Sequence, residues 1–106
     1  MTFETSCTVR TEADHTIFVV GVHLDAVSAD AFRRLVDTHA RDGGSSSIRV
    51  DLSATQFMDS MGIGVLVRLI KHAQAKGAPM EITGAQAQPH SLLKLLKIDQ
   101  VISVNC

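Results

Sequence analysis

The sequence predicts an α/β domain in which three or more helices pack against a mixed sheet of four to five strands. Short segments rich in β-branched residues alternate along the chain with amphipathic segments of helical periodicity. Strand–helix–strand units favour parallel pairing with right-handed crossovers. The two strands expected at the start of the chain follow each other directly, so they should add an antiparallel edge.

Size and composition indicate one globular domain over residues 1–106. Hydrophobic residues make up 45% of the chain and charged residues 20%, which is enough to bury a core. The 10 Lys and Arg are scattered and nearly balance the 11 Asp and Glu, which argues against nucleic acid as a partner. The sequence has neither an apolar run of about 20 residues nor a signal-peptide pattern, so we expect a cytoplasmic protein with no membrane contact.

Four segments are expected to be strands, and a weaker fifth covers residues 7–11. Residues 16–20 read TIFVV, and in SIRVDLS the residues Ile48, Val50 and Leu52 alternate with polar ones. The two remaining segments are MEIT at residues 80–83 and VISV at residues 101–104.

Three helices are expected between these strands. The first should cover about residues 29–41, with Ser28 as its N-cap and Gly43–Gly44 as its end. The second should run from Ser60 to Gly77. The third should open at a proline and direct four leucines toward the core; these residues are Pro89, Leu92, Leu93, Leu95 and Leu96.

The second helix should have two different faces. The apolar residues at helical spacing should face the sheet: Ile63, Leu66, Val67, Ile70 and Ala73. A different stripe should face solvent: Ser60, Gly64, Arg68 and Lys71.

The stretch MDSMGIGVLV at residues 58–67 contains the candidate site. Ser60 is expected at the exposed N-terminus of the second helix, where unpaired N–H groups and the helix dipole suit an anionic group such as phosphate. Gly62 and Gly64 would leave the surface beside it bare. In the alternative, Asp59 or Ser60 merely caps the helix and the glycines permit close packing against the sheet.

Other chemistry has little support in the sequence. Ser60 lacks the G-x-S-x-G elbow, and Gly62-x-Gly64 is only half of a dinucleotide fingerprint. Cys7 and Cys106 match no zinc spacing and are expected to be reduced thiols. The five histidines are expected to be surface or packing residues. We therefore expect no enzyme activity, no metal and no cofactor.

Residues 51–84 resemble the STAS-domain family, in particular bacterial anti-sigma factor antagonists, whose core reads D-L-S and then F-M/I-D-S-S-G-L-G-V-L. The matching residues are Asp51, Leu52, Ser53, Phe57, Met58, Asp59, Ser60, Gly62, Ile63, Gly64, Val65 and Leu66. LDAVSADAF at residues 24–32 and LLKLLKIDQVISV at residues 92–104 look like two further family segments. The resemblance extends over residues 16–104.

This resemblance implies a partner-switching role. Ser60 matches the serine that is phosphorylated by an anti-sigma factor that is also a serine kinase of the histidine-kinase-like ATPase fold. The unphosphorylated domain would bind this kinase, phosphorylation would release it, and a PP2C-type phosphatase would reset the cycle. The implied partner-binding residues are Asp25, Asp59, Ser60, Met61, Gly62, Gly64 and Arg68.

The sequence departs from the family pattern at three places. Met61 stands where a small residue is usual, GVHLD has one residue more than G-x-L-D before Asp25, and Lys97 replaces a glycine. A second role within the same family stays open: an unphosphorylated accessory subunit of a transporter ATPase complex, docked permanently through the same helix. A neighbouring gene for a kinase or for a transporter would distinguish the two.

Overall fold

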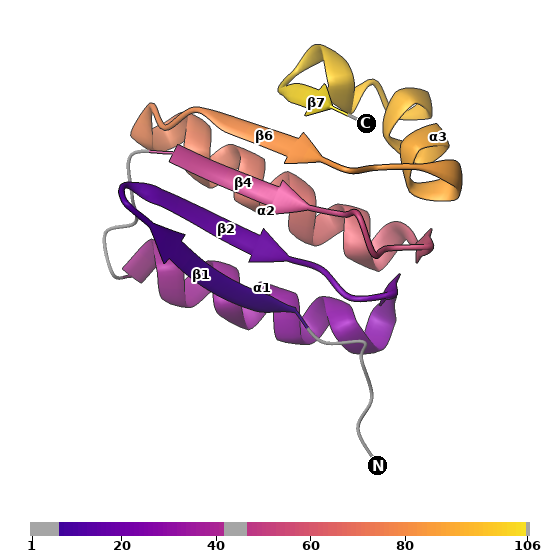
Figure 1. Ribbon diagram of the computed structural model, residues 1–106, viewed down its shortest axis with the longest axis horizontal. Coiled ribbons are helices and arrows are strands. Elements are labelled where there is room, and N and C mark those ends of the chain that lie inside the picture. The colour runs from indigo at the N-terminus through magenta and orange to yellow at the C-terminus, as the bar shows by residue number, and fades with distance from the viewer. Residues whose placement is uncertain (1–6, 42–46, 106) are drawn as a thin grey trace.

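The structure is a computed structural model that describes residues 7–41 and 47–105, and it has the predicted α/β architecture (Figure 1). In this part of the chain, five strands form one sheet in the order β1-β2-β4-β6-β7. The strands are β1 (Thr8–Glu12), β2 (His15–Val19), β4 (Ser47–Asp51), β6 (Met80–Thr83) and β7 (Ser103–Asn105). The β1–β2 pair is antiparallel and the other pairs are parallel, which confirms the predicted mixed sheet with an antiparallel edge.

Two long helices, α1 (Ala26–Arg41) and α2 (Ser60–Lys76), cover one face of the sheet (Figure 1). A shorter helix, α3 (Ala87–Leu95), follows the end of β6 and leads into the 3-10 turn η1 (Ile98–Gln100). Since β2, β4 and β6 all point the same way, the chain leaves their carboxyl ends at one edge of the molecule, where α2 begins and α3 lies.

The core lies between the sheet and the two long helices. Phe18, Val50 and Ile82 are paired in register on neighbouring strands, and all three are 0% exposed. Phe32 of α1 meets Phe18 edge to face, with the ring centroids 5.9 Å apart, and Leu66 of α2 is also fully buried. Burial of each such side chain contributes roughly 1.5–3 kcal/mol. The apolar residues that alternate along the strands therefore form the surface against which both helices pack.

A second, two-stranded ribbon lies at the carboxyl edge. It consists of β3 (His23–Leu24) and β5 (Phe57–Met58), which pair in parallel. Strands of two residues have no detectable periodicity, so the sequence analysis did not predict them. The ribbon joins the loops that follow β2 and β4, and it thereby brings the starts of α1 and α2 together.

The predicted N-cap of the first helix is wrong. The helix begins at Ala26, and the Asp25 side chain accepts the N–H groups of Val27 and Ser28 at 3.1 and 3.3 Å. The Ser28 hydroxyl in turn accepts the Asp25 N–H at 3.0 Å, so the two residues cap each other. The expected end at Gly43–Gly44 lies outside the described residues, as does Cys106.

The second helix has the predicted bounds and faces. It ends at Gly77, which adopts the left-handed conformation with φ of 69° that favours glycine. The five residues expected toward the sheet are buried or half-buried, and the four of the solvent stripe are exposed.

The third helix differs from its prediction. It starts at Ala87 rather than Pro89, and Leu95 and Leu96 are 76% and 47% exposed. Lys97 takes the left-handed conformation, with φ of 61°, at the position where the family usually has glycine. The chain reverses there and buries Ile98 instead, so the last two leucines are left outside the core.

Candidate functional site

The start of α2 is capped by Asp59. Its Oδ1 atom accepts the N–H groups of Met61 at 2.9 Å and Gly62 at 3.1 Å. Asp59 itself is extended, with φ of −120°, as an N-cap residue should be. Two N–H groups of the helix start are therefore already used by a carboxylate within the chain, which confirms the alternative that Asp59 caps the helix.

Ser60 is the first residue of α2 and is exposed. It directly follows the ionisable carboxyl of Asp59. A negatively charged group added to its hydroxyl would therefore meet a carboxylate, with two of the nearest backbone donors already used.

The two glycines beside Ser60 have different environments. Gly62 is buried, and a Cβ built on it would lie 2.4 Å from the carbonyl oxygen of Leu24. The expectation that Gly62 leaves the surface bare is thus wrong, because this glycine lets the helix approach β3. Gly64 is exposed, with nothing within 4 Å of a built Cβ. Only Gly64 provides bare surface one turn beyond Ser60.

Asp25 lies at the start of α1, which the β3–β5 ribbon brings next to the start of α2. Hydrogen bonds hold the pKa of its carboxyl below the ordinary value, chiefly the one from the Ser28 backbone N–H. Asp25 is therefore ionised at neutral pH. Its carboxylate is committed to capping α1.

Met61 lines a hollow of about 280 Å³ between α1 and α2. Ala26 and Ala29 of α1 and Val65 of α2 form other walls, and the Met61 side chain is 57% exposed. A methionine is flexible enough to fill an irregular gap. The departure of Met61 from the family pattern therefore changes the wall of this hollow rather than the environment of the core.

Arg68 ends a chain of charged side chains along α1 and α2. Its Nε donates to Asp37 at 2.8 Å, and Asp37 lies 3.8 Å from Arg33. Arg33 also pairs with Asp30 at 2.7 Å, which holds the Asp30 pKa below its ordinary value. Arg68 is exposed, as predicted, and its ion pair with Asp37 links the two helices.

Two apolar side chains that the sequence analysis missed are exposed near the same edge. Val27 in the first turn of α1 is 78% exposed, and Phe57 of β5 is 44% exposed. Val27 lies off the buried stripe of its helix, which is a signal that the sequence does contain. With Met61, they are three exposed apolar side chains at the carboxyl edge.

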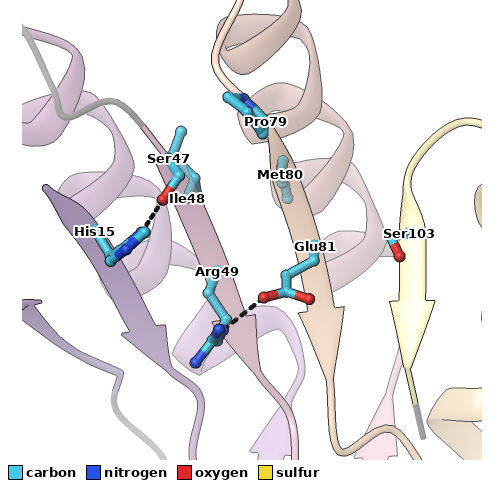
Figure 2. A pocket seen from close by; sticks show the side chains of 8 residues that line it. All are labelled: His15, Ser47, Ile48, Arg49, Pro79, Met80, Glu81 and Ser103. Carbon is cyan, nitrogen blue, oxygen red and sulfur yellow. Dashed lines mark hydrogen bonds and ion pairs between the residues drawn. The ribbon is translucent and has the colours of Figure 1, made fainter.

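A larger hollow, of about 350 Å³, lies at the opposite edge (Figure 2). It is lined by the first residues of β2, β4 and β6, among others, and so lies at the amino ends of the parallel strands. Arg49 and Glu81 point toward each other across it at 2.8 Å, and His15 bonds to Ser47 (Figure 2). Its charged side chains neutralise each other. Ligands of open α/β sheets bind at the carboxyl ends, so this hollow is not part of the candidate site.

The remaining titratable candidates have packing roles. His39 and His72 meet edge to face between α1 and α2, with the ring centroids 5.8 Å apart, and His39 also contacts the ring of Phe18. Cys7 is buried, which raises the pKa of its thiol to about 11. In residues 7–41 and 47–105, no three His, Cys, Asp or Glu gather as metal ligands would. Nor does any helix there combine the length and apolarity needed to cross a membrane.

A mixed sheet with helices on one face and a capped, exposed helix start at its carboxyl edge define the class of small α/β domain to which this chain belongs. The sequence model of the STAS domain family matches residues 6–105. The chain therefore belongs to the STAS domain family.

Solved structures share this fold. A putative anti-sigma factor antagonist from Thermotoga maritima has 20% identity and a TM-score of 0.86, covering 94% of this chain and 86% of that one. The Bacillus cell fate determinant SpoIIAA in its phosphorylated form has 13% identity and a TM-score of 0.76, covering 92% and 89%. A sulfate transporter family protein from Wolinella succinogenes has 11% identity and a TM-score of 0.77, covering 91% and 80%.

Proposed function

We propose that this chain is an anti-sigma factor antagonist that switches partners through phosphorylation of Ser60. The unphosphorylated domain binds an anti-sigma factor that is also a serine kinase of the histidine-kinase-like ATPase fold. Phosphorylation by that kinase releases the domain, and a PP2C-type phosphatase restores the bound form. The antagonists among the structural neighbours support this proposal, as does the family motif around Ser60.

One observation carries the proposal: an exposed serine follows directly on a carboxylate that already uses the N–H groups of the helix start. A phosphate adds about −1.5 to −2 charges. On Ser60 it would be repelled by Asp59, and those two donors could not compensate it. The proposed contact around the phosphate would be apolar, because it includes the exposed residues Val27, Phe57 and Met61. Burying the phosphate there would also cost desolvation free energy. Both effects oppose docking.

The other residues of the proposed partner contact lie at the same carboxyl edge of the sheet. Gly64 gives a partner close access to the helix one turn beyond Ser60, and Asp25 before α1 and Arg68 on α2 add charged groups to the proposed contact. Gly62 is buried and contributes indirectly, because it lets α2 pack against β3.

The test is incubation with ATP and a candidate kinase, namely a histidine-kinase-like ATPase whose gene neighbours this one, with the phosphate mapped by mass spectrometry. We expect the phosphate on Ser60 alone and none in Ser60→Ala. Of Ser53 and Thr55, which precede Ser60 in the same loop region, Ser53 is the exposed competitor, because Thr55 is 0% exposed and donates to the Gly21 carbonyl at 2.8 Å. A phosphate on Ser53 would contradict the proposal.

The accessory-subunit role makes the opposite prediction. The transporter-family neighbour has the same fold, so the fold is compatible with that role as well. In that case the domain would stay unphosphorylated and remain bound to a transporter ATPase at all times. Co-purification with such an ATPase, together with no phosphate on Ser60, would replace the switch by the permanent dock.

A further inference from the structure

Strand β5 has a second edge that faces away from β3. The N–H groups of Phe57 and Asp59 both point to β3, where they meet the carbonyls of Val22 at 3.4 Å and Leu24 at 3.2 Å. Alternate residues of a strand direct their N–H and C=O groups to opposite sides, so those of Met58 point the other way. No further strand of the described chain pairs with β5 on that side. Met58 is nevertheless only 1% exposed, and water cannot readily satisfy these two groups.

The side chain of Gln88 takes the place of the missing strand. Its Oε1 accepts the Met58 N–H at 2.9 Å, and its Nε2 donates to the Met58 carbonyl at 2.8 Å. A side-chain amide offers a donor and an acceptor side by side, as the N–H and C=O of a single residue in a paired strand do. Gln88 comes from the first turn of α3, 30 residues further along the chain. The ribbon is therefore completed by a helix.

These bonds hold a particular peptide plane. The Met58 carbonyl and the Asp59 N–H belong to the same planar unit. Gln88 holds the carbonyl on one side, and the Leu24 carbonyl holds the N–H on the other. The next rotatable bond is φ of Asp59, whose carboxylate then caps α2 and starts the helix at Ser60.

We propose that Gln88 is a positioning residue for Ser60, through which the seating of α3 sets the orientation of the Met58–Asp59 peptide and hence the presentation of the phosphoacceptor. The coupling belongs to the free protein. Its consequence for phosphorylation rests on the proposed function. The two parts can therefore be tested separately.

The first test uses amide hydrogen exchange of the free protein, read residue by residue by NMR, in Gln88→Met and Gln88→Glu. Methionine is similar in length but replaces neither hydrogen bond. We expect protection of Met58, Asp59 and Met61 to fall at least tenfold, while the amides of β4 and of the second half of α2 keep theirs. Unchanged protection at residues 58–61 would overturn the proposal. So would an equal loss of protection throughout the chain, since that would make Gln88 a contributor to global stability only.

Gln88→Glu adds a rescue within one variant. An ionised carboxylate can accept the Met58 N–H but has no hydrogen for the Met58 carbonyl, whereas the protonated acid can donate to it. Because the Met58 N–H keeps its acceptor, the readout is Asp59 and Met61: their protection relative to wild type should be lost at pH 7 and return as the pH falls below the pKa of the new carboxyl. The control is Gln86→Glu, because Gln86 is the N-cap residue of α3 and its side-chain amide donates to the Ser53 carbonyl at 3.1 Å rather than to Met58. A loss of the same size at residues 58–61 in the control would assign the effect to negative charge rather than to Gln88.

The second test measures phosphorylation of Ser60 by the neighbouring kinase. We expect kcat/KM for Gln88→Met to fall at least fivefold and that for Gln86→Met to stay at the wild-type value. An unchanged rate in a Gln88 variant that has lost protection would overturn the role in presenting Ser60. If the wild type takes no phosphate at all, the proposed function fails, and the exchange experiment still decides whether Gln88 positions residues 58–61.

Discussion

The carbonyl oxygen of Leu24 would lie 2.4 Å from a Cβ on Gly62, and the same oxygen accepts the Asp59 N–H at 3.2 Å. The first turn of α2 and the end of β3 thus approach as closely as a glycine allows. This contact lies next to Asp59 and Ser60. The backbone conformation at Ser60 therefore depends on Gly62, a buried residue that no partner needs to touch.

Gly62→Ala should destabilise the domain, and Gly64→Ala should stabilise it. The methyl group on residue 62 meets the backbone oxygen of Leu24, which cannot yield easily, and the buried Leu24 side chain, at a cost of roughly 1–3 kcal/mol, against a gain in helix propensity of at most about 1 kcal/mol. On residue 64 the methyl group meets nothing within 4 Å, so only the gain remains. Urea unfolding of both variants provides the measurement. Equal effects at the two positions would contradict the difference in packing.

Gly64→Arg should abolish partner binding while the fold stays intact. An arginine is accommodated at this exposed site and is a better helix former than glycine, yet it would occupy the surface one turn beyond Ser60. Calorimetric titration with the partner kinase should show at least a tenfold loss of affinity. Gln74→Arg is the matched control, because it adds the same side chain to an exposed site farther along α2. Normal binding by Gly64→Arg would mean that the docking face is elsewhere.

Ser60→Asp should weaken kinase binding, and Ser60→Ala should bind at least as well as wild type. Both residues are tolerated at this position, since Asp59 supplies the cap and a negative charge in the first turn suits the helix dipole. The aspartate brings one negative charge into the contact, which should cost on the order of 1–3 kcal/mol, or roughly 5- to 150-fold in affinity. Titration calorimetry measures the difference.

Sigma-dependent transcription should distinguish Ser60→Ala from wild type further. Ser60→Ala cannot be phosphorylated, so it should keep the sigma factor free and transcription on. If Ser60→Ala and wild type give the same transcription from a sigma-dependent reporter while the kinase is active, Ser60 is not the switch.

The stability of the domain should depend on pH through Asp25. Hydrogen bonds lower the pKa of this carboxyl in the folded state, so ionised Asp25 favours folding. Its contribution is complete above the unfolded-state pKa of about 3.9 and is lost as the pH falls through the lower folded-state value. The stability difference between wild type and Asp25→Asn should therefore shrink in acid. Parallel stability curves for the two proteins from pH 7 to pH 2 would contradict this.

Local patterns in the sequence were sufficient for the main elements. The alternation around Val50 predicted a strand, and the stripe of Ile63, Leu66 and Ile70 predicted both α2 and the face that it buries. These signals depend only on the period of the backbone and on the burial of apolar side chains, so they can be recognised without knowing what lies opposite.

Local patterns failed where a choice depended on a distant residue. Leu95 and Leu96 fit the helical period, but α3 ends at Leu95, Lys97 turns left-handed, and the chain buries Leu93 and Ile98 while these two leucines stay exposed. Ser28 and Asp25 are both good caps, and the choice between them followed from the ribbon that fixes the chain at His23 and Leu24.

The exposed serine at the start of a helix could be predicted from the sequence, because helix capping and amphipathic spacing are local. The neighbours that hold this serine in place depend on the fold. Gly62 and Gly64 cannot be distinguished from the local sequence, but only Gly62 packs against Leu24. Gln88 carries no signal of its own, since its role arises from two backbone groups of Met58 that the fold leaves without a strand. Contacts between residues far apart in the chain depend on how the elements meet in space, which the local period of a sequence does not encode.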